Sequence, residues 1–129
     1  MQRRSQGFTL IEVLIVVAII GVLATLAYNG YQSAMRKSNR SAAQSFLMDA
    51  AQRQQQYLLD ARAYAPDIAT LNVPVPDSVS RFYTLSVALV AGPPPGFTIT
   101  ATPVSGTTQA VDGALSVNQA GTRTPPDKW

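Results

Sequence analysis

The sequence contains no cysteine and no histidine among its 129 residues. Without cysteine, neither a disulfide bond nor a thiolate metal site can form. Without histidine, the chain lacks the side chain that most often serves as a general base and as a metal ligand. Charge is also scarce, because Asp, Glu, Lys and Arg make up 13% of the residues. We therefore expect no metal and no cofactor.

The seven carboxylates are scattered along the chain. They are Glu12, Asp49, Asp60, Asp67, Asp77, Asp112 and Asp127. No two have a spacing typical of acid–base catalysis, and no glycine-rich loop indicates phosphate binding. The composition predicts a protein that is not an enzyme and has no catalytic residue.

The formal charge of +3 and the sequence pI of about 9.6 suggest a nucleic-acid partner at first sight. However, two of the ten basic residues, Arg3 and Arg4, lie close to the N-terminus. The remaining basic residues nearly balance the seven acidic ones. The basic pI is therefore little evidence for nucleic-acid binding.

What the chain does have is a long apolar run, Phe8–Tyr28. As a helix with a rise of about 1.5 Å per residue, about 21 residues span the ~30 Å hydrocarbon core of a bilayer. Between Arg4 and Arg36, Glu12 is the only charged residue.

Three interpretations of this run are open. A signal peptide cleaved after Ala27 would have a shorter apolar core, of about 7–15 residues. A plain single-pass anchor would leave Glu12 without a partner, at a cost of about 2.5–3.5 kcal/mol if it lay at the bilayer centre. Cleavage between Gly7 and Phe8 would create a positively charged α-amino group, which could neutralise Glu12 of a neighbouring subunit.

The stretch from Gly7 to Ala24, GFTLIEVLIVVAIIGVLA, resembles the processing site and N-terminal helix of type IV pilins and pseudopilins. The resemblance implies that a prepilin peptidase cleaves after Gly7 and that Phe8 becomes N-methylated. It also implies that Glu12 is the charge partner during assembly.

The same resemblance implies a location and partners. The chain would be stored in the inner membrane as a single-pass protein with a cytoplasmic N-terminus, and would then enter an extracellular pilus filament. The implied partners are other pilin subunits, the prepilin peptidase and the inner-membrane pilus assembly machinery.

The helix is expected to continue beyond the apolar run, to about Leu59, because apolar residues recur at three- and four-residue steps from Ala43 to Leu58. Asn29–Gly30 is the place where it could break, since both residues are weak helix formers. The predicted organisation is a cleaved leader (1–7), a transmembrane and filament-core helix (8–32), an amphipathic helix (33–62) and a loop with a sheet head (63–129).

Strand signals follow a proline-containing connecting loop at 66–80. Apolar and polar residues alternate at 84–89, 97–102 and 115–117. A sheet with one apolar face needs a cover, and the helix around 43–58 is the available one. The predicted fold class is α+β: a long N-terminal helix with a small antiparallel β-sheet packed on its C-terminal half, the pilin fold.

The head resembles the PilE-like subgroup of minor pilins at 82–87, 96–103, 121–125 and Trp129. Relatives of this kind close a C-terminal loop with a disulfide, and the corresponding positions here are near Ala114 and at Lys128. The loop must therefore be held in another way or be mobile. Burial of Trp129 would anchor it, but an exposed Trp129 is equally compatible with the sequence.

The leading interpretation is a structural subunit: a minor pilin of a type IV pilus, a class of fimbria associated with cell adhesion and twitching motility. A type II secretion pseudopilin is an alternative that shares the N-terminal features. Calcium-binding pseudopilins carry an acidic C-terminal loop, whereas only Asp112 and Asp127 lie in that region here.

A filament-displayed minor pilin that binds DNA or a surface is the other alternative. Its candidate residues are Arg36, Lys37 and Arg40, or Arg123 and Lys128. Solvated surface charge is the simpler explanation of both clusters.

Overall fold

The computed structural model describes residues 7–129. The predicted leader therefore lies outside the described residues, apart from Gly7. The chain divides into two compact units, Met1–Ala34 and Met35–Trp129, and each is described here by itself. We call the second unit the head.

Helix α1 (Leu10–Ala61) supplies nearly all described residues of the first unit. Its apolar part is long enough to cross a membrane. An 18-residue stretch of this part has a mean hydropathy of 2.8, and none of that stretch is buried. Asn29–Gly30 does not interrupt α1. The expected helix, Phe8 to about Leu59, is confirmed to within two residues at each end.

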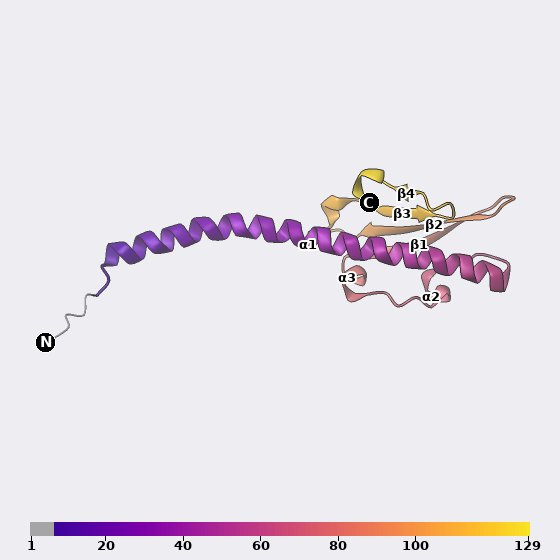
Figure 1. The fold of residues 1–129 in the computed structure, drawn as a ribbon, viewed down its shortest axis with the longest axis horizontal. Helices are drawn as coiled ribbons and strands as arrows, with labels where there is room; N and C mark the ends of the chain where they lie inside the picture. The colour runs from indigo at the N-terminus through magenta and orange to yellow at the C-terminus, as the bar shows by residue number, and fades with distance from the viewer. Residues whose placement is uncertain (1–6) are drawn as a thin grey trace. The chain divides into compact units, whose positions relative to one another are not determined.

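The head adds two single-turn helices and a sheet to the second half of α1 (Figure 1). In chain order the elements after α1 are α2 (Ile68–Leu71), α3 (Asp77–Ser80), β1 (Tyr83–Val90), β2 (Gly96–Pro103), η1 (Ala110–Asp112), β3 (Leu115–Asn118), β4 (Arg123–Thr124) and η2 (Pro126–Lys128). The sheet is antiparallel and four-stranded, in the order β1-β2-β3-β4.

The three predicted strands are confirmed, and their register places the apolar residues in one row across the sheet. Val87 lies opposite Ile99, which lies opposite Val117. The two-residue strand β4 was not predicted. The segment 66–80, expected to be irregular, also contains α2 and α3. α2 begins where the Asp67 side chain accepts a hydrogen bond from the Thr70 backbone N–H at 2.7 Å.

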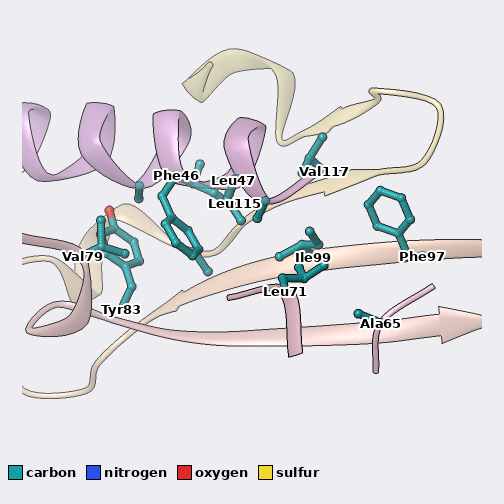
Figure 2. Close-up of a cluster of buried hydrophobic side chains, with 13 residues drawn as sticks. Phe46, Leu47, Ala65, Leu71, Val79, Tyr83, Phe97, Ile99, Leu115 and Val117 are labelled. Carbon is teal, nitrogen blue, oxygen red and sulfur yellow. The ribbon is translucent and has the colours of Figure 1, made fainter. Parts of the chain in front are cut away.

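The core of the head lies between α1 and the apolar face of the sheet (Figure 2). Its fully buried side chains include Leu47 from α1, Phe97 and Ile99 from β2, and Leu115 and Val117 from β3. Helix and sheet thus cover each other's apolar surfaces, as the α+β prediction requires.

Candidate assembly site

Glu12 lies in the first turn of α1. Its backbone N–H donates to the Thr9 hydroxyl at 3.3 Å, and the Val13 N–H donates to the Thr9 carbonyl at 3.3 Å. Thr9 therefore caps the helix and fixes where it begins. The positive end of the helix dipole favours a carboxylate in this turn. In the described part of the chain, no side chain hydrogen-bonds to the Glu12 carboxylate.

The apolar residues around Glu12 are exposed. Phe8, Leu10 and Ile11 are exposed to 83%, 78% and 67%, and every residue from Gly7 to Tyr31 is in the exposed class. A continuous apolar surface of this length needs a lipid or protein cover. Gly7, Phe8 and Glu12, the predicted processing and assembly residues, thus lie at the start of that surface.

The predicted basic clusters of the head are partly engaged in internal contacts. The Arg40 guanidinium forms a salt bridge with Asp112, in which Nε donates to Oδ2 at 2.6 Å. The Lys128 ammonium donates to the Asp112 backbone carbonyl. The Arg123 guanidinium lies over the Trp129 ring, 5.4 Å from its centroid. Three of the five candidate DNA-binding residues therefore have partners within the head.

These contacts surround a buried polar cluster that the sequence did not reveal. The Gln109 side chain is fully buried; its amide donates to Asp112 Oδ2 at 2.8 Å and to the Arg36 carbonyl at 3.2 Å. Its Oε1 accepts from the Asn39 amide at 3.4 Å. One sequence feature could have indicated this cluster: Asn39 is a polar residue on the same face of α1 as the buried Ala43.

Hydrogen bonding, burial and charge in this cluster shift the pKa values of Arg40, Asp112 and Tyr83. The hydrogen bond from Arg40 holds the pKa of Asp112 below its ordinary value, despite opposing burial. Burial, together with the nearby Asp112 charge, raises the pKa of Tyr83 to about 12. The Tyr83 hydroxyl is buried and makes no hydrogen bond of normal geometry among the described residues, although the Gln109 side chain is close enough to oppose the rise in its pKa.

Trp129 is half-buried and packs against the core, and its indole N–H points to the Thr124 carbonyl at 3.4 Å. It thus supplies part of the anchor for the C-terminal loop. Within residues 7–129, no group of three His, Cys, Asp or Glu side chains could hold a metal ion.

Comparison with known proteins adds two family matches. Residues 30–115, more than half of the chain, match the family described as type IV minor pilin ComP, DNA uptake sequence receptor. Residues 2–28 match the prokaryotic N-terminal methylation motif.

Three relatives agree with these matches. The type IV wide pilus major component PilA4 of Thermus thermophilus is 38% identical over 69 residues, which cover 54% of this chain and 53% of the relative. The type II secretion system core protein G of Dickeya chrysanthemi is 34% identical over 64 residues, 50% of this chain and 42% of the relative. The fimbrial protein EcpC of Eikenella corrodens is 51% identical over 39 residues, 30% of this chain and 26% of the relative.

The aligned stretches thus span about half or less of these curated relatives. A prepilin methylation motif, a helix with an exposed apolar surface and an α+β head coincide in one chain. The chain belongs to the type IV minor pilin family.

Proposed function

We propose that the protein is a structural subunit of a type IV pilus. The observation that carries the proposal is the apolar surface that begins at Gly7, continues along α1 to Tyr31 and is exposed throughout, with Glu12 as its single carboxylate. Lipid can cover this surface before assembly, and the helices of neighbouring subunits can cover it in a filament. Residues 8–32 form the segment that lipid covers before assembly and that neighbouring helices cover in the filament.

Processing after Gly7 prepares this exchange. The cut removes Arg3 and Arg4 and leaves an α-amino group on Phe8. That cation neutralises Glu12 of a neighbouring subunit inside the helix bundle, where an unpaired carboxylate would be costly. Apolar packing drives association, and the ion pair fixes the axial register of one helix against the next.

Before assembly, the helix holds the chain in the inner membrane with its N-terminus in the cytoplasm. A seven-residue leader is poorly suited to translocation, whereas the domain that follows an anchor can cross the membrane largely regardless of its charge. The prepilin peptidase and the pilus assembly machinery then act on the chain from this location.

Substitution of Glu12 tests the assembly mechanism. We expect Glu12→Ala and the isosteric Glu12→Gln to insert into the membrane normally but to be lost from sheared filaments, by at least about tenfold. Asp60→Asn, which neutralises an exposed carboxylate near the end of the same helix, is the matched control and should assemble normally. Immunoblots of membrane and filament fractions give the measurement. Normal amounts of Glu12→Gln in filaments would refute the charge-partner role.

DNA reception is a second candidate, favoured by the description of the matching family. Arg40 and Lys128 are hydrogen-bonded to Asp112. The remaining candidates for phosphate contacts are Arg36, Lys37 and Arg123, which is exposed although its guanidinium lies over the Trp129 ring. Filaments that bind DNA less tightly as salt rises, and less tightly still with Arg123→Ala, would favour this candidate. Binding that is unchanged by Arg123→Ala would place any DNA contact elsewhere.

A further inference from the structure

The last eight residues of the head, 122–129, are held differently from the rest of it. We call this segment, which comprises β4 and η2, the strap. None of its residues is buried, and only Pro125, Lys128 and Trp129 are half-buried. β4 pairs with β3 at two positions, whereas β1 pairs with β2 at eight. Segments that have few buried contacts and few strand-pairing hydrogen bonds unfold locally most readily.

A chain of polar contacts closes the strap onto the helix. The Lys128 ammonium donates to the Asp112 carbonyl, and the Lys128 carbonyl accepts from the Gln44 amide of α1. Asp112 is itself fixed by its salt bridge with Arg40 and by the Gln109 amide. We call these contacts of Arg40, Gln44, Gln109, Asp112 and Lys128 the latch. A chain without cysteine has no covalent bond to do this work.

The strap covers specific surfaces of the head. Trp129 and Arg123 line a hollow whose other wall is Gln44, Ser45, Met48 and Asp49 of α1. β4 also occupies the outer edge of β3. Departure of the strap would therefore uncover the α1 surface around Met48 and a row of backbone hydrogen-bonding groups on β3.

We propose that the strap opens as a unit while α1, β1, β2 and β3 stay folded, and that the latch sets how often it opens. Arg40 and Gln109 order Asp112, Asp112 orders the Lys128 ammonium, and Lys128 holds the strap. Loss of any link loosens the strap without removing an apolar side chain from the core.

The latch makes this opening sensitive to acid. The titratable groups that interact with Asp112 are Arg40 from α1 and Lys128 from η2, and through its charge Tyr83 from β1, while Asp127 acts on Arg40. Because Arg40 lowers the pKa of Asp112, the ionised carboxylate of Asp112 stabilises the closed strap fully above the ordinary pKa of about 3.9. This stabilisation is lost as the pH falls through the lower value in the folded head. Arg40, whose pKa is raised, stays charged throughout.

Trp129, the only tryptophan of the chain, is a built-in reporter. The experiment measures acrylamide quenching of Trp129 in the full chain in detergent micelles at pH 7, together with hydrogen exchange of the β1–β2 segment, 83–103. We expect Lys128→Met to raise the quenching rate constant about twofold and to leave exchange of 83–103 unchanged. Lys37→Met, the same substitution at an exposed position on α1, should change neither.

A titration tests the acid sensitivity. In the unaltered chain, quenching should rise as the pH falls below about 4, while 83–103 stays protected. In the Asp112→Asn variant, Trp129 should be quenched more strongly already at pH 7, and quenching should not rise further as the pH falls. Wild-type quenching in Lys128→Met, or loss of protection at 83–103 together with the change at Trp129, would overturn the proposal. An acid transition retained in Asp112→Asn would overturn the role of Asp112.

Discussion

At the scale of single residues, Gln54 shows how one buried polar side chain can fix a loop. It is fully buried, and its amide donates to the Ala65 carbonyl at 2.9 Å while its Oε1 accepts from the Ala65 N–H at 2.8 Å. Ala65 is buried as well, so both of its backbone groups depend on this one side chain. Gln54 therefore ties the segment after α1 back onto the helix.

Gln54→Ala should lower the free energy of unfolding of the head by about 2–4 kcal/mol, because two buried backbone groups lose their partners. Gln55→Ala is the matched control: Gln55 is exposed and makes one contact of 3.4 Å, to the Gln119 carbonyl. Its effect should stay within about 0.5 kcal/mol. Urea titrations of the full chain in detergent, followed by circular dichroism, measure both. Equal effects of the two substitutions would contradict the assigned role of Gln54.

The sequence could not identify these polar partners. Arg40 and Asp112 lie 72 residues apart, and Asn39 and Gln109 lie 70 apart, so no local pattern links them. The sequence alone therefore leaves Arg40 a candidate DNA contact, whereas in the structure Arg40 forms a salt bridge with Asp112. Glu12 is different, because a single charge inside a long apolar run is visible without any partner.

At the scale of elements, α1 is the best-predicted part of the fold. Its apolar residues follow the helical period, so the buried face containing Leu47 could be read from spacing. β1, β2 and β3 were predicted from strict alternation. β4 has two exposed residues and no alternation to detect. α2 and α3 have four residues each, too few for a periodic pattern.

A buried and an exposed leucine of α1 should differ in how much their substitution lowers stability. Leu47 is completely buried, whereas Leu59, on the same helix, is 82% exposed. Leu47→Ala should cost about 2–5 kcal/mol, because it leaves a cavity between helix and sheet. Leu59→Ala should change stability by no more than about 0.5 kcal/mol. The same urea titration distinguishes them, and a small effect at Leu47 would contradict the described core.

At the scale of the whole molecule, the chain combines two units with different needs. The head has a buried apolar core of its own, which includes Phe97 and Leu115. The apolar surface of the first unit is exposed and must be covered by lipid or by other subunits. The family could be predicted from the sequence because the methylation motif is local and contiguous. The role of Gly7, Phe8 and Glu12 stays a prediction, since it concerns contacts between chains.

We propose that this chain is processed after Gly7 and built into a filament. Intact-mass analysis of filaments sheared from the cell surface measures both steps. We predict that the chain is present in the filaments and that its mass corresponds to residues 8–129 with one added methyl group on Phe8. A chain that is absent from the filaments, or that retains its first seven residues there, would contradict the claim.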